Sequence, residues 1–419
     1  MTPNQAGRTR ARVGARARRV AWRSRDVWAI SLSACFADLG YQAVLAGFPL
    51  FLVLTLHQPV WEFGLASALS YGGGALCSYA GGRIGDRFGH RSLALAGNAA
   101  IPLLSLCALV ASPVWAVGLM TGGWWARNLR SPSRRVMLVE AVPAEEHRSS
   151  AFGFLHALDV GGGALAGVYV LAALALHVQF RWIFLATVLP LAVSTLSLSR
   201  AHVGGRRPAA APAPAAGEGA APLPPGAKAL FGAAALYGFT FYSVGFPVLT
   251  VAQGSGRLVA GIGAFFVLQA ASALTGYILG GRLGSTPADQ FARLGLLGYL
   301  GGGVGAGVLA FGYGEHLGLA VLLVGVAIIG FALGVVETLE PTAMSVLRSG
   351  RRAGRGFGTL SAARSVGTFA ANLVMGLLYG IGASVAYGYA AVLAAVSAAI
   401  VLGAIPALRT WQRGQNHDS

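Results

Sequence analysis

Charged side chains are scarce in this sequence. Asp, Glu, Lys and Arg together make up 11% of the 419 residues, against about 25% in ordinary soluble domains. Hydrophobic residues make up 55%, which is more apolar surface than a soluble fold can use while it presents a wetted exterior. Apolar runs long enough to cross a bilayer recur along the whole chain. The composition therefore excludes a soluble globular domain and predicts an all-α membrane protein.

Cysteine is rare, and so are the usual signs of an enzyme. Cys35, Cys77 and Cys107 are the three cysteines, and all lie within apolar runs. Their number and spacing exclude a disulfide framework and a cysteine-based metal site. The histidines are scattered singly, and no glycine-rich loop carries the lysine of a nucleotide-binding site. We therefore expect no enzymatic activity, no ATP-driven pump, no metal and no cofactor.

The charge that is present is mostly positive, with a net value of +17. Basic residues gather in short segments between apolar runs, which is the pattern that sets orientation in a membrane and not one of nucleic-acid binding. If the runs cross alternately, only Arg181 and Arg257 lie on the side opposite the two chain ends. This asymmetry predicts that both termini are cytoplasmic, in the inner membrane of a bacterium.

The first residues form a basic tail, 1–26, followed by a first apolar run of nearly thirty residues. A cleaved signal peptide has a shorter apolar core and a small-residue cleavage site. We therefore expect the first run to be retained as a span. The arginines of the tail could also contact anionic lipid headgroups.

Twelve apolar runs have the length of a membrane span, which is about 20 residues. We expect the spans at residues 27–56, 61–82, 92–111, 113–129, 150–176, 180–198, 228–252, 259–281, 294–314, 317–347, 356–380 and 383–406. Residues 199–227 consist largely of Pro, Ala and Gly, a composition that stays disordered or extended. The chain is thus expected to contain two six-helix bundles, 27–198 and 228–406, joined by a disordered cytoplasmic linker, and a cytoplasmic tail, 407–419.

The two halves resemble each other in sequence. Residues 81–85 (GGRIG), after the second span, recur as residues 280–284 (GGRLG) after the eighth. Residues 152–157 (FGFLHA), which open the fifth span, recur as residues 357–362 (FGTLSA) at the start of the eleventh. Two matches at equivalent places indicate an internal duplication, the usual construction of carriers that work by alternating access.

The loop after the second span carries a recognisable motif. Residues 81–91 read GGRIGDRFGHR and closely resemble the loop motif of the major facilitator superfamily, with a histidine where one basic residue is usual. The resemblance implies twelve helices in two pseudo-symmetric six-helix bundles that rock about a central site. It also implies that the loop clamps the halves together on the cytoplasmic side in the outward-facing state. The matching residues, which are assigned this gating role, are Gly81, Gly85, Asp86, Arg87, Gly89 and Arg91.

A narrower resemblance is to a poorly characterised bacterial branch of the same family. It rests on Ala37-Asp38 in the first span, on the basic stretch 130–134 that opens the loop after the fourth span, and on Ala157-Leu158-Asp159 in the fifth. The chain departs from this branch at Tyr41 and Gln42, where relatives have an acidic residue, and at Gly123-Trp124, where they tend to have Asp-Arg.

Few ionisable side chains lie inside the expected spans, where each costs a few kcal/mol unless it faces protein or water. In the resembling family, helices 1, 4, 7 and 10 line the central cavity, which would place Asp38, Arg127 and Glu337 near the substrate. Glu337 and Glu340 share a helix face, and Pro341 should kink the helix beside them. We therefore expect substrate binding or proton coupling at Asp38, Arg127, Glu337 and Glu340.

Each of these assignments has a structural alternative. Asp38 and Arg127 could be a pair that locks two helices together, and the two glutamates could pair with the basic cluster 348–355. Asp159 and Arg364 occupy nearly equivalent repeat positions with opposite charge, on helices that meet between the halves in the resembling family. We expect structural or gating roles for both.

Aromatic side chains are candidates for the wall of a pocket. Trp124 in the fourth span and Tyr237 and Phe241 in the seventh would line an amphipathic cavity. They could equally face lipid.

Taken together, the sequence predicts a secondary active transporter, acting as a monomer in the lipid bilayer, for a small-molecule substrate. Proton-coupled efflux of a small organic solute is the expected activity, since a carboxylate whose solvation alternates can load a proton on one side and release it on the other. An importer or facilitator of a hydrophilic solute is an alternative, favoured by a cavity richer in carboxylates and arginines than in aromatics. A non-transporting scaffold or receptor that retains the fold is another.

Overall fold

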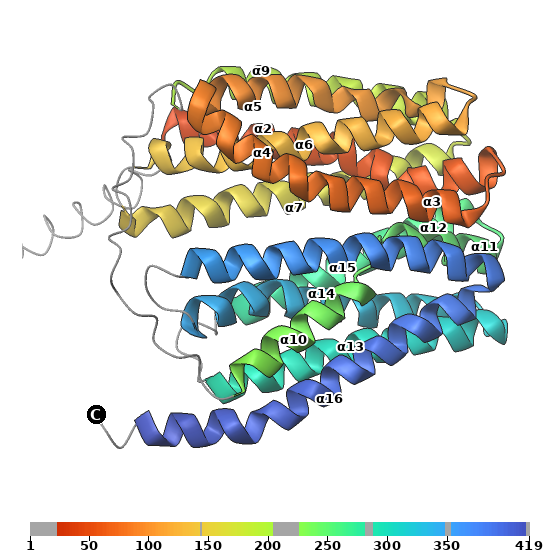
Figure 1. The fold of residues 1–419 in the computed structure, drawn as a ribbon. Coiled ribbons are helices and arrows are strands. Elements are labelled where there is room, and N and C mark those ends of the chain that lie inside the picture. Colours follow the sequence, from red (N-terminus) through yellow and green to blue (C-terminus); the bar gives the residue numbers. More distant parts are fainter. Residues whose placement is uncertain (1–22, 143–144, 204–225, 281–287, 348–352, 416–419) are drawn as a thin grey trace, which may run out of the picture.

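The structure is a computed structural model that describes residues 23–142, 145–203, 226–280, 288–347 and 353–415. All regular structure in these ranges is helical (Figure 1). The arginine-rich residues 1–22 and most of the expected linker, 204–225, lie outside the described residues, as does the second copy of the repeated loop from residue 281.

The N-terminal half contains six helical segments, several of which change helix type along their length. The first is α2 (Arg25–Pro49) continued by the π-helical turn η1 (Leu50–Thr55). The others are α3 (Val60–Ala68) with η2 (Leu69–Gly73) and α4 (Gly74–Phe88), α5 (His90–Ala100) with η3 (Ile101–Leu109), α6 (Pro113–Ala141), α7 (Glu145–Ala175), and α8 (Phe180–Ala186) with α9 (Val188–Ser199).

The C-terminal half repeats this count in its described residues. Its first segment is broken into α10 (Ala227–Tyr237), η4 (Gly238–Thr240) and α11 (Gly245–Ser255), with a bend of 42°. The remaining segments are α12 (Leu258–Gly280), α13 (Ala288–Gly314), α14 (Leu319–Leu347), α15 (Ala353–Ile381) and α16 (Ala383–Gln415). Each of the twelve expected spans thus falls on a helix, and α14 continues through Pro341.

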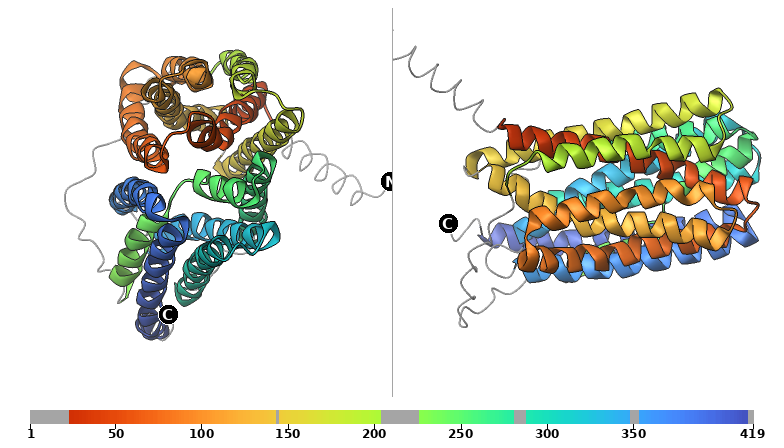
Figure 2. Two further views of the ribbon diagram at one scale, coloured as in Figure 1. Left: turned by 90° about the vertical axis from the view of Figure 1, so that its right-hand side faces the viewer. Right: turned by 90° about the horizontal axis from the view of Figure 1, so that it is seen from above.

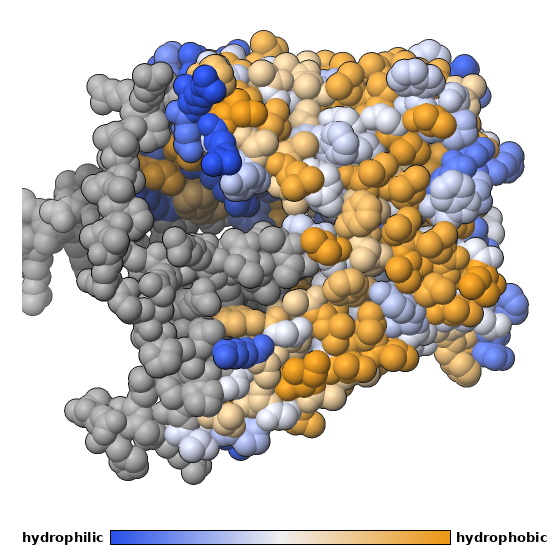
Figure 3. Space-filling model, viewed as in Figure 1, coloured by the Kyte–Doolittle hydropathy of each residue, from blue (hydrophilic) through white to orange (hydrophobic). Residues whose placement is uncertain are grey.

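By length and composition, eight of the described helices could cross a membrane, or nine if the bent pair is one span. Three expected spans fall short of this test. They correspond to α3 through α4, to α6 and to α15, which contain polar residues or a shorter apolar stretch. The structure is consistent with twelve crossings. Large apolar side chains such as Val114 and Tyr277 are mostly exposed on the sides of the bundle, as expected where lipid covers the surface (Figure 3).

The expected end of the fourth span is wrong. The sequence placed residues 130–134 in a basic loop after residue 129, whereas α6 runs on to Ala141 with Pro132 inside it. Arg130 and Arg134 are buried there. Arg130 donates to Asn98 of α5, and Arg134 to Asp159 of α7, so neighbouring helices of the N-terminal half supply a partner to each arginine where the hydropathy of α6 falls.

The halves lie side by side with α2 near the middle (Figure 2). In the most apolar part of α2 and η1, 83% of the residues are buried, against 28% to 44% in the other single-helix spans. The reason is that α2 packs against α7 and α9 of its own half and α11 of the other. A polar side chain on α2 is therefore enclosed by protein and not by lipid.

The start of α2 and the end of α16 lie at the same end of the molecule, which we call the terminal end (Figure 1). The halves contact each other at the opposite end, where α3 packs on α15. A Cβ added to Gly64 would lie 2.7 Å from the Cα of Gly376, and the rings of Phe63 and Phe246 are 5.0 Å apart. Toward the terminal end the surface is hollowed between the halves (Figure 3).

Candidate functional site

A cavity of about 420 Å³ lies between the two halves. Aromatic side chains from both halves line its wall, and polar groups are set among them: Gln42, Thr240, Ser243, Gln269, Ser365 and Thr368. Ligand pockets are usually built in this way, with an apolar wall and a few oriented polar groups. The aromatic lining residues are Tyr71, Trp124, Tyr237, Phe241, Tyr242 and Phe265.

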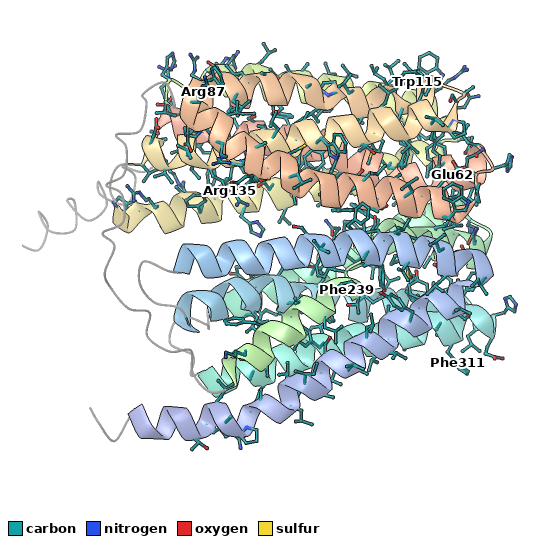
Figure 4. All side chains as sticks on the ribbon, in the orientation of Figure 1. Glu62, Arg87, Trp115, Arg135, Phe239 and Phe311 are labelled. Atoms are coloured by element: carbon teal, nitrogen blue, oxygen red, sulfur yellow. The ribbon has the colours of Figure 1, made fainter. Side chains whose placement is uncertain are left out.

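The break in the seventh segment brings several aromatics to this wall. Residues 241–244 are not helical, so backbone groups there lack helical partners. The side chain of Asn372 on α15 accepts a hydrogen bond from the backbone N–H of Ser243 at 2.8 Å, and Gly367 lets α15 approach Gly238 closely. Figure 4 shows Phe239 in this region, beside α15. The break is thereby fixed, and Tyr237, which stacks on Tyr299 at 4.3 Å, lies at its edge.

Trp124 supplies the aromatic surface of the N-terminal half. Its ring lies 5.7 Å from that of Tyr41 and 5.3 Å from that of Tyr71. The side chain is buried and lines the cavity. Tyr237 and Phe241 line the cavity from the other half; that the three aromatics bind a solute stays a prediction.

Glu337 is the one charged side chain among the residues that line the cavity in the described part of the chain. It lies on α14, and Ser365 of α15 lines the same cavity. The side chains of Glu340 and Arg364 lie outside the described residues. Their expected roles stay predictions.

The other charged candidates form a buried cluster inside the N-terminal half and do not line the cavity. Asp38 on α2 is 4% exposed. The guanidinium of Arg127 on α6 lies over the rings of Tyr41 and Trp124, at 5.2 and 5.0 Å from their centroids, and donates to the hydroxyl of Tyr41 at 3.3 Å. No ion pair joins Asp38 and Arg127 in the described structure, so the expected locking pair is not present.

Asp159 on α7 is the partner of this cluster. Its carboxylate accepts from the guanidinium of Arg134 at 3.3 Å, and it lies within hydrogen-bonding reach of Asp38. The sequence placed Asp159 at the interface between the halves, and α7 does contact α12. The side chain itself is directed toward α2 and α6. Its proposed gating role stays a prediction.

Sequence analysis missed two members of the cluster, Arg130 and Arg134. Arg130 is fully buried and donates to the side-chain oxygen of Asn98 on α5. Asn98 in turn donates to Ser194 and Thr195 of α9 at 3.0 and 2.8 Å. The spacing of Arg127, Arg130 and Arg134 on one helix face was the available signal.

The loop motif joins helices within the N-terminal half. A Cβ on Gly81 would meet the backbone oxygen of Leu129, so α4 can approach α6 only with glycine there. Gly89 has φ of 96° between α4 and α5, a conformation that favours glycine. Asp86 and His90 lie 3.2 Å apart. Gly85 packs beside His90.

The arginines of the motif differ in their surroundings. Arg91 donates to the backbone oxygens of Ala201 and Ser199 at 2.9 and 2.8 Å, which fastens α5 to the end of α9. Arg87 is exposed at the terminal end, far from Glu62 and Trp115 at the opposite end (Figure 4). The main contacts of α4 and α5 are with elements of their own half. Among the described residues, the side chains of the motif make their recorded contacts within the N-terminal half, and the clamp between halves that the resemblance implies stays a prediction.

The described residues contain no group of three or more His, Cys, Asp or Glu side chains that could hold a metal ion. Asp38, Asp159, Arg134 and Glu337 could carry charge or protons, and the cavity could hold a small molecule.

Comparisons with known proteins agree with this arrangement. A family model described as "Major Facilitator Superfamily" matches residues 30–347. No curated protein shows significant sequence similarity to the chain. Among solved structures, a POT family transporter in complex with a thioalcohol-conjugated peptide has a TM-score of 0.73 at 13% identity, covering 92% of this chain and 96% of that chain.

Two further structures are similar over most of their length. The nucleoside transporter NupG has a TM-score of 0.68 at 11% identity, covering 91% of this chain and 98% of that one. A bacterial homologue of the human lysosomal transporter Spinster, in an inward-facing and unoccupied conformation, has a TM-score of 0.65 at 14% identity, covering 94% and 98%. At these identities the likeness shows the fold alone.

Proposed function

Since the chain belongs to the Major Facilitator Superfamily and is therefore a multi-pass secondary transporter of a small molecule, we propose that it exports an amphipathic organic solute in exchange for protons. The solute binds in the central cavity, and the two halves rock about it to expose it to each side in turn. The bilayer and the proton gradient are its only required partners.

The wall of the cavity is the observation that carries this proposal. Six aromatic residues line it, and Glu337 is the one charged residue among its described lining. Buried aromatic rings bind apolar surface well, and those with a polar tip also offer a hydrogen bond. A site for a sugar or another strongly hydrophilic solute would need more charged and amide groups to replace the solute's water. The balance favours an amphipathic solute.

The orientation in the membrane is supported by the charge asymmetry. Arg87 lies at the terminal end (Figure 4), as do Arg91 near the start of α5 and Arg148 near the start of α7, whereas Arg181 lies near the start of α8 at the opposite end. Basic residues are enriched on the cytoplasmic side, so we assign the terminal end to the cytoplasm. The contact of Gly64 with Gly376 closes the opposite end, a conformation in which an exporter takes up its solute and an importer releases it.

The test uses everted membrane vesicles that contain the protein and hold a pH gradient reported by a fluorescent amine. A panel of amphipathic cations, peptides, nucleosides, sugars and organic acids is added in turn. We expect one amphipathic class to collapse the gradient. Glu337→Gln and Asp38→Asn should each reduce the response by more than about tenfold, since each removes a group that binds the solute or the proton.

Glu315→Gln is the matched control, because Glu315 is an exposed carboxylate at the opposite end; it should respond as the wild type does. Collapse by a sugar or another strongly hydrophilic class would still show proton exchange, but it would refute the amphipathic solute. If no compound responds while the protein is folded and inserted, proton exchange is refuted, and a facilitator or the non-transporting alternative is favoured.

A further inference from the structure

We propose that Asp38 and Asp159 together form one proton-binding site inside the N-terminal half, with Arg134 as its counter-charge, at a place distinct from the solute cavity. The role of this site in transport rests on the proposed proton-coupled export. It assigns to Asp159 a part in proton binding, where the sequence predicted gating.

Asp38 is the first observation. Its side chain is 4% exposed, and its Oδ1 has no hydrogen-bond partner in the described structure. An ionised carboxylate enclosed in this way would retain a large desolvation cost, because one oxygen would face protein with no donor. A neutral carboxyl group, which donates through its other oxygen, fits the position better.

Asp159 supplies the acceptor for such a donor. Asp38 lies against α7 at Gly162, one turn from Asp159, and the two carboxyl groups interact across this contact. The charge of Asp159 is balanced by Arg134 at 3.3 Å, so Asp159 can stay ionised while Asp38 carries the proton. Adjacent carboxyl groups that share one proton are a general solution where two like charges cannot both be ionised.

The backbone is built to bring these groups together. Gly162 lies one helical turn after Asp159, and a Cβ there would meet the backbone oxygen of Cys35, with the Cβ of Asp38 only 3.1 Å away. The absent side chain allows α7 to lie directly on α2. Without this approach the two carboxyl groups would be separated.

Three further arginines of α6 lie around the pair. Arg127 is held by Tyr41 and Trp124, and Arg130 donates to Asn98; these partners are neutral. Arg135 lies one residue beyond Arg134 on α6 (Figure 4). From the C-terminal half, α11 and α12 pack on α2 and contain no charged residue. Arg134 is the arginine that forms an ion pair with the site, at Asp159.

The proton site and the solute cavity share helices but not residues. On α2, Gln42 lines the cavity, and Asp38 lies one turn nearer the terminal end. On α6, Trp124 lines the cavity, and Arg127 likewise lies one turn nearer the terminal end. Solute binding and proton binding can therefore influence each other through the positions of α2 and α6. No direct competition for one carboxylate is needed.

Infrared difference spectroscopy of the purified protein during a pH titration tests the proton site without any solute. A neutral, enclosed carboxyl group gives a C=O stretching band distinct from that of a carboxylate. We expect the wild type and Glu315→Gln to show the same band, and Asp38→Asn to lack it. In Asp159→Asn the band should change frequency, because Asp38 loses its acceptor. As the pH is raised, the band should also disappear at a lower pH than in the wild type, because Arg134 becomes free to favour the ionised form of Asp38.

The double variant Arg134→Gln with Asp159→Asn removes both members of the ion pair. It replaces Asp159→Asn in the infrared measurement if that single variant does not fold. It too should alter the frequency of the Asp38 band. A band that is the same in Asp159→Asn as in the wild type, or one that survives Asp38→Asn, would overturn the proposal. If the infrared result is as expected but vesicles show no solute-driven proton movement, the proton site stands and proton-coupled export is refuted.

Discussion

At the scale of single residues, Gly162 determines whether two carboxyl groups can meet. Its position against the backbone of Cys35 leaves no room for a methyl group. The neighbouring Gly161 has open space around its Cα. The two adjacent glycines therefore differ in the space they leave for a side chain, although the sequence shows only a run of three glycines, 161–163.

We expect Gly162→Ala to lower the free energy of unfolding by about 1–3 kcal/mol, since it forces α7 away from a rigid backbone. Gly161→Ala should cause no loss, because alanine is the better helix former and meets nothing. Thermal unfolding of both variants in one detergent measures the difference. Equal melting temperatures would show that α2 and α7 are not in the described contact.

At the scale of elements, the loop motif acts as a fastening within the N-terminal half. Arg91 bonds two carbonyl oxygens at the end of α9, where backbone acceptors lack helical partners. In this conformation, then, the motif stabilises the packing of α5 on α9.

Arg91→Gln should lower the free energy of unfolding by about 1–2 kcal/mol, because charge-assisted hydrogen bonds to both carbonyls are lost. Arg83→Gln is the control, since Arg83 is exposed and lies over the ring of Tyr79. The measurement is chemical unfolding followed by tryptophan fluorescence. An Arg91 variant as stable as the control would contradict the fastening role.

At the scale of the whole molecule, the contact of α3 with α15 closes one end of the cavity. Gly64 and Gly376 bring the two helices together with no side chain between them. A transporter of this kind must separate this contact in the other half of its cycle. The contact is thus a place where a single substitution can shift the balance between conformations.

Gly376→Leu should favour the conformation open at the opposite end. A clash of about 1–3 kcal/mol corresponds to a shift of roughly 5- to 150-fold in the ratio of the two states. Spin labels at residues 57 and 315, in a chain with the native cysteines replaced by alanine, report the distance between the halves. Gly380→Leu, where a side chain meets nothing, should leave it unchanged; a distance unaltered in both variants would refute the closing role.

The sequence by itself determined the fold class, the twelve helical segments and the family. These properties follow from hydropathy, which acts along the chain, and from a loop motif that is local in sequence. The sequence also named Trp124, Tyr237 and Phe241 as candidates for a pocket wall, but it left open whether they face lipid. The structure places all three at the cavity.

Only the tertiary structure decided which charges meet. Arg130 and Arg134 read as a cytoplasmic loop because hydropathy counts a guanidinium as polar wherever it lies, yet they are buried in α6. The sequence left open a pair of Asp38 with Arg127, and the structure brings Asp38 to Asp159, 121 positions further along the chain. Such a pairing depends on how closely two helices approach. A glycine permits a close approach, but the sequence alone does not show which glycine lies at the contact.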